Sequence, residues 1–240
     1  MNIRDFYINC IRDVLGISSV VDFSVKFFYE LGRAESNVAI KVANFNPNFS
    51  SQNCFEKFRA SSEFSNSQFL DNGMFIWIVP DIIWYNHLVI LNDELDFFKI
   101  PKDSLNLNED DLFELRYVYA RICSVFRHYN KWFPADSLNS IHEANLHLIS
   151  RQDIIRLVRT MVAFTLLDLK KRNQVNVYIR GLSESFNKAW SESLPHEELG
   201  FITLANITET KSRLAVLNVL KRMLLKFFKT LGVDAQEELV

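Results

Sequence analysis

Glycine and proline are scarce in this sequence, with six and five residues among 240. Nucleotide-binding loops and β architectures with many turns need glycine where the backbone turns tightly, so the scarcity argues against both. Neither G-x-x-x-x-G-K nor G-x-G-x-x-G occurs, and the nucleophile motif G-x-S-x-G is also missing. The sequence therefore shows no sign of the common nucleotide-dependent or hydrolytic active sites.

Cysteine and histidine are too few and too scattered to predict a bound metal. Cys10, Cys54 and Cys123 are odd in number and widely spaced, which fits neither a disulfide framework nor a zinc site. His142 and His147 lie five residues apart, so on a regular helix their side chains diverge by roughly 140°. We therefore expect no metal, no cofactor and a reducing, cytoplasmic location.

Long apolar runs are missing as well. No stretch approaches the ~18 apolar residues that a membrane span needs. The longest candidate, "FIWIVPDIIW", is interrupted by Pro80, and the first ten residues carry charge where a secretion signal would be apolar. We expect a cytoplasmic chain without a transmembrane segment.

The residues that are present describe an ordinary globular protein. Hydrophobic residues make up 48% and charged residues 23%, and the net charge of −2 argues against a protein that coats nucleic acid through bulk charge. Phenylalanine is abundant, with 21 residues, and together with the many Asn, Ile and Lys it suggests an AT-rich coding sequence. Mobile elements, phages and antiviral-defence islands often have this composition.

The spacing of apolar residues predicts helices and a small sheet in the first half of the chain. Periods of three to four predict helices over residues 2–15 and 18–31, which would form an antiparallel hairpin. Alternation predicts a strand over 38–43, and β-branched and aromatic residues on either side of a Pro-Asp turn predict a β-hairpin of residues 73–79 and 82–91.

From residue 108 onward the pattern is helical. Asn108 or Asn106 is placed to cap a helix that reaches Phe133, and further helices are expected up to Arg172, over residues 174–190 and from Thr208 or Thr210. The predicted fold class is α+β, predominantly α: an N-terminal helical hairpin with a small antiparallel sheet of about three strands, followed by a C-terminal helical bundle. We expect a mixed region (1–105) and a bundle region (106–240) in one compact unit.

The last helix has an apolar stripe that permits two interpretations. Its residues recur at alternating spacings of three and four along one face: Leu217, Leu220, Leu224, Phe227 and Leu231. Burial in the core of the bundle is the default for such a stripe, and a seam that binds a protein partner is the alternative. A helix lying on a membrane surface is a third interpretation.

Basic residues gather on two of the predicted helices. One set precedes and follows the apolar middle of the helix that ends near residue 172: Arg151, Arg156, Arg159, Lys170, Lys171 and Arg172. The second set lies on the polar side of the last helix: Lys221, Arg222, Lys226 and Lys229. These residues are candidate nucleic-acid contacts, although solvated helix faces have the same composition.

One spacing is typical of an enzyme. In "RICSVFRH", Arg121 lies seven residues before His128, so both side chains return to the same helix face. This element is similar to the Arg-x(4–6)-His element of HEPN-type ribonucleases, which are helical and commonly dimeric. The resemblance covers these two residues and implies a His that acts as base or acid on an RNA 2′-hydroxyl.

Three hypotheses of function follow. The first is a non-enzymatic helical subunit of a larger cytoplasmic protein assembly, of the mobile-element, phage or antiviral-defence type, which binds a protein partner or itself. The second is a HEPN-like ribonuclease that acts as a dimer through Arg121 and His128. The third is a nucleic-acid-associated accessory protein that uses the basic helix faces.

Overall fold

The fold is that of a computed structural model in which two compact units, Met1–Ile83 and Trp84–Val240, are each described by themselves. The structure describes residues 9–10, 12–13, 23–27, 37–42, 56, 60–61, 67–69, 74–105, 107–135, 137–167, 169, 172–192 and 197–238.

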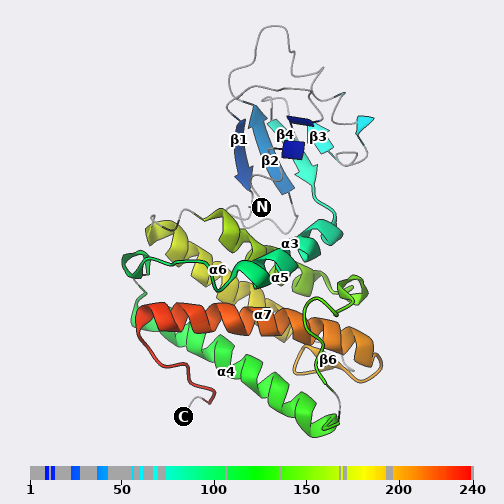
Figure 1. The fold of residues 1–240 in the computed structure, drawn as a ribbon, viewed down its shortest axis with the longest axis vertical. Helices are drawn as coiled ribbons and strands as arrows, with labels where there is room; N and C mark the ends of the chain where they lie inside the picture. The colour runs from blue at the N-terminus through cyan, green and yellow to red at the C-terminus, as the bar shows by residue number, and fades with distance from the viewer. Residues whose placement is uncertain are drawn as a thin grey trace. The chain divides into compact units, whose positions relative to one another are not determined.

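The first unit contains an antiparallel sheet with strand order β1-β2-β4-β3 (Figure 1). Its strands are β1 (Phe23–Phe27), β2 (Asn37–Val42), β3 (Ser67–Phe69) and β4 (Met74–Ile78). The register pairs Val25 with Ile40 and Ile40 with Phe75. In β1 the residues Phe23, Val25 and Phe27 alternate along the strand, and such β-branched and aromatic residues favour a pleated surface.

The fold class predicted from the sequence is therefore wrong. The expected second helix, residues 18–31, contains strand β1, so no helical hairpin forms there. The expected strand over residues 82–91 is helical, and the sheet has four strands rather than about three. The expected first helix, 2–15, lies outside the described residues except for helical residues 9–10 and 12–13.

Helix α3 (Asp81–Glu94) shows why the hairpin prediction failed. Trp84, Leu88 and Leu91 are buried at spacings of four and three, which is the period of a helix face. Pro80 directly precedes the helix, and the carboxylate of Asp81 lies in its first turn, where the helix dipole favours a negative charge. The Pro-Asp pair thus begins a helix instead of turning a hairpin.

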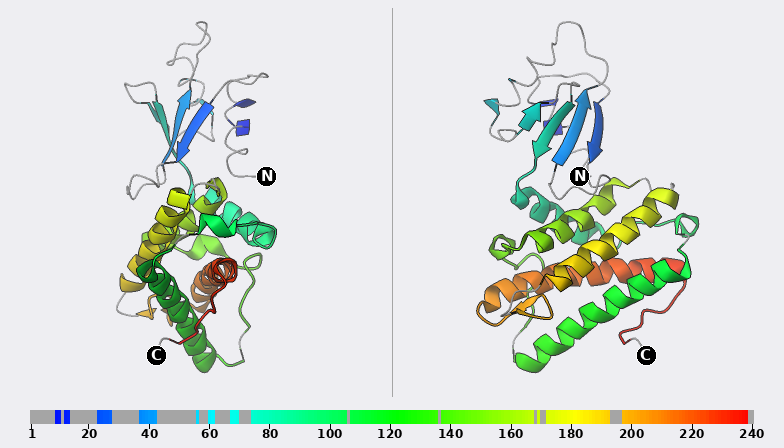
Figure 2. Two further views of the ribbon diagram at one scale, coloured as in Figure 1. Left: turned by 90° about the vertical axis from the view of Figure 1, so that its left-hand side faces the viewer. Right: turned by 180° about the vertical axis from the view of Figure 1, so that it is seen from behind.

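Besides most of α3, the second unit contains four α-helices among the described residues (Figures 1 and 2). These are α4 (Glu109–Trp132), α5 (Gln152–Ala163), α6 (Arg172–Ser191) and α7 (Ile207–Leu231). Helices α4 and α5 each contact both α6 and α7, so the four enclose one core. Short 3-10 helices accompany them: η3 (Lys102–Ser104), η4 (Leu146–Leu148) and η5 (Phe164–Leu166). Within the described residues, no helix is long and apolar enough to span a bilayer.

Side-chain caps fix where the two longest helices begin. The Asn108 side chain accepts a hydrogen bond from the Asp111 backbone N–H at 2.7 Å, as the sequence predicts for one of its two candidate caps. Helix α7 is capped by Asn206, whose side chain accepts from the Glu209 N–H at 3.0 Å, and not by a threonine. It ends at Gly232, whose φ of 73° is a left-handed conformation that favours glycine.

The core of the second unit lies around α7. Phe227 and Phe164 pack edge to face with ring centroids 5.7 Å apart, and Phe164 also packs against Tyr178 at 5.8 Å. Buried residues occur on most sides of α7, including Val219, which lies away from the main stripe. Leu225 is a large apolar residue of α7 that stays exposed, with 40% of its surface accessible. Such a helix derives its stability from packing more than from intrinsic propensity.

Candidate nucleic-acid interface

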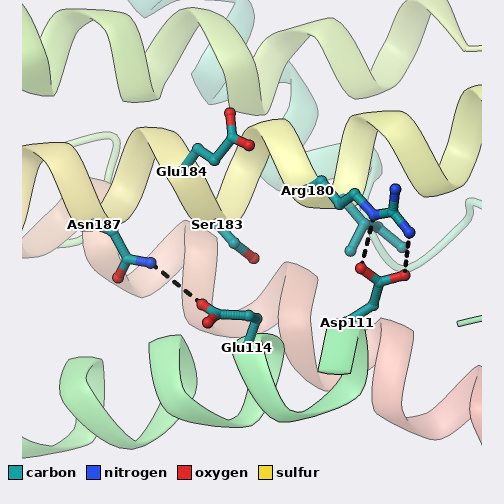
Figure 3. Close-up of a pocket in the computed structure, with 7 residues that line it drawn as sticks. Asp111, Glu114, Arg180, Ser183, Glu184 and Asn187 are labelled. Carbon is teal, nitrogen blue, oxygen red and sulfur yellow. Dashed lines mark hydrogen bonds and ion pairs between the residues drawn. The ribbon is translucent and has the colours of Figure 1, made fainter. Parts of the chain in front are cut away.

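A polar pocket of about 290 Å³ lies between α4 and α6 (Figure 3). It is lined by Asp111, Glu114, Ile179, Arg180, Ser183, Glu184 and Asn187. Of the α6 residues among these, Figure 3 shows Arg180, Ser183 and Asn187 directed toward α4, at spacings of three and four, whereas the Glu184 carboxylate points away from α4. We refer to this site as the α4–α6 pocket.

Two polar contacts hold the walls of the α4–α6 pocket together. Arg180 donates from Nε to Asp111 Oδ1 at 2.7 Å and from Nη2 to Asp111 Oδ2 at 3.0 Å, a bidentate pair. This guanidinium lowers the pKa of the Asp111 carboxyl below its usual 3.8. Asn187 Nδ2 donates to Glu114 Oε2 at 3.3 Å.

Two further polar atoms of the pocket are buried without a hydrogen-bond partner among the described residues. They are Ser183 Oγ and Asn187 Oδ1. Ser183 is only 5% exposed, and Figure 3 shows its hydroxyl directed toward the space between the two helices. Within the described part of the chain, no three His, Cys, Asp or Glu side chains lie close enough to hold a metal ion.

Aromatic rings and one guanidinium form a surface on the same pair of helices. Phe113, which is 56% exposed, stacks with Tyr117 at a centroid distance of 6.3 Å and an angle of 12°. The guanidinium of Arg121 lies 4.0 Å from the centre of the Tyr117 ring and 4.5 Å from that of Trp190 on α6, and it donates a hydrogen bond to Tyr117 Oη. We call Phe113, Tyr117, Arg121 and Trp190 the cation–aromatic shelf.

The shelf changes how the Arg121 and His128 pair is interpreted. Arg121 is enclosed by the rings of Tyr117 and Trp190, whereas His128 is exposed and packs edge to face on Trp132 at 5.6 Å. Seven residues along a helix also separate the two by about 10 Å. The structure does not bring them together at one reacting group.

Arg151, a predicted nucleic-acid contact, is buried. It donates from Nη1 to the Gly200 carbonyl at 2.6 Å and from Nη2 to the Ala189 carbonyl at 2.8 Å, and it pairs with Asp153. Ala189 lies in the last turn of α6, so Arg151 caps one of the carbonyls at the end of that helix. Its charge is used inside the fold.

The other basic residues predicted before and at the start of α6 are either half-buried or outside the described residues. Arg156 and Arg159 on α5 are half-buried. Lys170 and Lys171 lie outside the described residues. Arg172 is the first residue of α6, and its side chain is likewise outside the description. Nucleic-acid contact by these basic residues therefore stays a prediction.

On α7, three of the four predicted basic contacts bind other parts of the chain. Arg222 donates to the Asn92 side chain at 2.5 Å and to Asp96 at 2.9 Å. Lys226 donates to the carbonyls of Leu95 and Asp96, at 2.7 and 2.9 Å.

The third of these, Lys221, lies over the Tyr119 ring at 5.5 Å and 3.8 Å from Glu237. Lys229 is exposed. The apolar stripe of α7 is likewise internal, since Leu217, Leu220, Leu224 and Phe227 are at most 1% exposed and Leu231 is half-buried. No protein partner can reach those four side chains in this fold.

Comparison with known proteins places the bundle in a family. The profile of the DALR anticodon binding domain matches residues 115–239, which is more than half of the chain and runs from α4 to the C-terminal segment. The chain belongs to this family. Nucleic acid is thus the class of ligand that the family description names.

Curated relatives are arginine–tRNA ligases. The chain is 28% identical over 153 residues to the enzyme of Agrobacterium fabrum, 27% over 155 to that of a Methylobacterium species, and 24% over 161 to that of Rickettsia prowazekii. These matches cover 61%, 62% and 64% of this chain but 26%, 26% and 28% of the relatives. The chain thus spans about a quarter of their length. No solved structure gives a significant match.

The family corrects two hypotheses of function. The prediction of a phage, mobile-element or antiviral-defence subunit is wrong, because an anticodon binding domain accounts for the helical half of the chain. A biased composition reports on the origin of a gene and carries no mechanism. The HEPN-like ribonuclease is also wrong, because its two-residue element lies within the matched domain and Arg121 is enclosed by aromatic rings.

Sequence reasoning missed the cation–aromatic shelf. Phe113, Tyr117 and Arg121 follow one another at spacings of four, so they form a line along one face of α4 that the sequence could have revealed. Trp190 joins them from α6, 69 residues after Arg121 in the chain, and no local pattern predicts that meeting.

Proposed function

We propose that the chain binds the single-stranded anticodon loop of a transfer RNA, with the cation–aromatic shelf as the surface on which unpaired bases stack. The observation that carries this proposal is the contact of the Arg121 guanidinium with the rings of Tyr117 and Trp190, beside the exposed ring of Phe113. Unpaired RNA bases are commonly held on aromatic rings and guanidinium planes.

The charge of the chain favours RNA binding through contacts with bases rather than through contacts with phosphates. The net charge is −2, and most of the described cations on α7 are engaged within the fold. A surface with few free cations gains little binding free energy from phosphate contacts. Contacts with the unpaired bases would therefore supply most of the affinity.

The names of the relatives suggest the RNA and the process. We propose that the partner is a tRNA that accepts arginine and that binding serves its aminoacylation in the cytoplasm. The role that we propose for this chain is binding, and the protein partner predicted from the sequence would be the enzyme that charges the bound tRNA.

Fluorescence anisotropy with a labelled RNA hairpin tests the proposal, with a fully paired duplex of the same stem as competitor. We expect the hairpin to bind more tightly than the duplex. Tyr117→Ala and Arg121→Ala should each weaken hairpin binding by roughly tenfold, because stacking of one base contributes about 1–3 kcal/mol. Lys229→Ala removes an equal charge from an exposed position outside the shelf and serves as the matched control. Equal binding of hairpin and duplex, or no loss in the shelf variants, would refute the proposal.

A further inference from the structure

The α4–α6 pocket carries polar groups that the chain itself does not use. A serine hydroxyl within a helix commonly donates to the carbonyl four residues earlier, as the threonines here do: Thr160 to Arg156 at 3.0 Å and Thr230 to Lys226 at 2.9 Å. Ser183 does not, and its buried Oγ has no partner among the described residues. A buried hydroxyl without a partner is costly, and a ligand in the pocket would relieve that cost.

The groups left over in the pocket are mostly acceptors. The Nε and Nη2 groups of Arg180 both donate to Asp111, and the Asn187 amide nitrogen donates to Glu114. Asn187 Oδ1 and Ser183 Oγ remain without a partner among the described residues, whereas the exposed carboxylate of Glu184 points away from α4. The amide oxygen of Asn187 can only accept and the Ser183 hydroxyl can accept or donate, so a ligand that brings an N–H donor can satisfy both atoms.

The volume and the charge of the pocket limit further which ligands can bind there. A volume of about 290 Å³ lies at the small end of ligand pockets, enough for one ring system and its substituents. Three carboxylates and one guanidinium line it, from Asp111, Glu114, Glu184 and Arg180. This excess of negative charge repels phosphate and favours a neutral group that donates hydrogen bonds.

The cation–aromatic shelf continues from the pocket along the same two helices. Tyr117 lies three residues after Glu114 on α4, and Trp190 lies three residues after Asn187 on α6, which is one helical turn in each case. A strand of RNA that places one base in the pocket can therefore place a neighbouring base on the shelf.

We propose that the α4–α6 pocket receives one unpaired nucleobase that carries an exocyclic amino group (cytosine, adenine or guanine) and discriminates against uracil; this rests on the proposed function. The amino group donates to Asn187 Oδ1 or to a pocket carboxylate, and Ser183 Oγ bonds the ring edge. Uracil has a carbonyl where cytosine has its amino group, so its oxygen would face these acceptors. Enzymes that read an unstacked base use the same combination of edge hydrogen bonds and stacking.

The test uses the full chain and a set of RNA hairpins that differ only in the loop. One loop contains uridine alone, and the others carry a single cytidine, adenosine or guanosine at each loop position in turn. We expect at least one such loop to bind more tightly than the uridine loop. Ser183→Ala should reduce this preference by about twofold to tenfold, the range for one hydrogen bond.

Controls separate the pocket from the helix that carries it. Ser185→Ala removes a hydroxyl two residues away, where Ser185 Oγ lies 3.0 Å from Thr160 Oγ1 on α5, and should leave the preference unchanged. Glu184→Gln neutralises an exposed carboxylate that points away from α4, without removing volume, and should likewise leave the preference unchanged.

If the wild-type chain binds all loops alike, or if Ser183→Ala keeps the full preference, the inference is overturned while the proposed loop binding stands. If no hairpin binds, the proposed function fails, and this inference fails with it.

Discussion

Arg180 and Asp111 join α6 to the first turn of α4 through two parallel hydrogen bonds, of 2.7 and 3.0 Å. Asp111 also donates its backbone N–H to the capping side chain of Asn108. One residue thus links the start of a helix to its neighbour across 69 positions of the chain. The pair fixes one end of the α4–α6 pocket, so its loss would affect both stability and the pocket.

We expect the Asp111–Arg180 pair to be sensitive to acid. The pKa of Asp111 is lowered mainly by its hydrogen bond from Arg180, so the stabilisation is present above the usual pKa of 3.8 and is lost as the pH falls through the lower pKa of the folded state. Asp111→Asn should lower the melting temperature at neutral pH and bring no further loss in strong acid. Melting temperatures of both proteins across this range should therefore converge at low pH, and a constant difference would contradict the assignment.

Leu224 should be essential to the fold. It is fully buried, and a carboxylate placed there without a partner costs several kcal/mol, which approaches the ~5–15 kcal/mol that stabilises a typical domain. Leu224→Asp should abolish the cooperative melt followed by circular dichroism or make the protein insoluble. Leu225→Asp, at the neighbouring 40% exposed position, is the control and should melt near the wild-type temperature. A soluble Leu224→Asp protein with an unchanged melt would show that α7 is not in the core.

Arg151 should matter for stability and not for RNA. Arg151→Ala would leave two buried carbonyls and the Asp153 carboxylate without their partner. The expected loss is on the order of 3 kcal/mol in the free energy of unfolding, or roughly 10 °C in melting temperature. Arg156→Ala, at a half-buried position on α5, which begins just after Arg151, should cost far less. Hairpin affinity measured below the melting transition should be unchanged in Arg151→Ala, and a selective loss of affinity would instead make Arg151 an RNA contact.

His87 on α3 should make the free energy of unfolding depend on pH in a second way. Burial lowers its pKa from 6.5 to about 4, so the folded state keeps the ring neutral where the unfolded chain takes up a proton. Its contribution is present above pH 6.5 and is lost as the pH falls toward 4, by on the order of 3 kcal/mol. In His87→Gln this part of the acid dependence should disappear. Nuclear magnetic resonance titration of the ring provides the direct check, and a pKa near 6.5 would contradict the burial.

The sequence predicts much of the helical half because the signals there are local. Asn108 is a good cap, the apolar residues of α4 keep one face over its length, and Gly232 ends α7 in the left-handed conformation. Each of these signals acts within about one helical turn. These signals can therefore be recognised in the sequence without knowledge of the tertiary contacts.

Secondary structure was harder to predict in the first half of the chain and at the start of the second unit, because residue preference and apolar spacing indicate different structures there. Residues 82–91 are rich in β-branched and aromatic residues, yet they are helical because Trp84, Leu88 and Leu91 find buried positions at helical spacing. Burial of a helix face outweighs intrinsic β preference, which spans only about 1 kcal/mol. In β1 the error is the opposite one, because a predicted helix is a strand. Its apolar residues fit both the helical and the strand period, and pairing with β2 determines that the segment is extended.

The candidate site could be predicted only in part. The line of Phe113, Tyr117 and Arg121 is visible on one helix, but Trp190 and the pocket residues Ser183 and Asn187 come from α6. The basic residues suggested by composition were a poorer guide, because Arg222 and Lys226 bind α3 and the segment that follows it. Charge alone does not reveal whether a cation faces solvent or a carbonyl.

Stacking of a loop base on the cation–aromatic shelf is the central claim, and the fluorescence of 2-aminopurine measures it most directly. The probe replaces one loop base at a time in the RNA hairpin, and its emission falls when it stacks on an aromatic ring. We predict quenching at one or more loop positions with the wild-type chain and with Lys229→Ala, and loss of that quenching with Tyr117→Ala at concentrations of each protein that saturate the RNA. Quenching that persists in folded Tyr117→Ala and Trp190→Ala proteins, or that appears only at stem positions, would contradict the account.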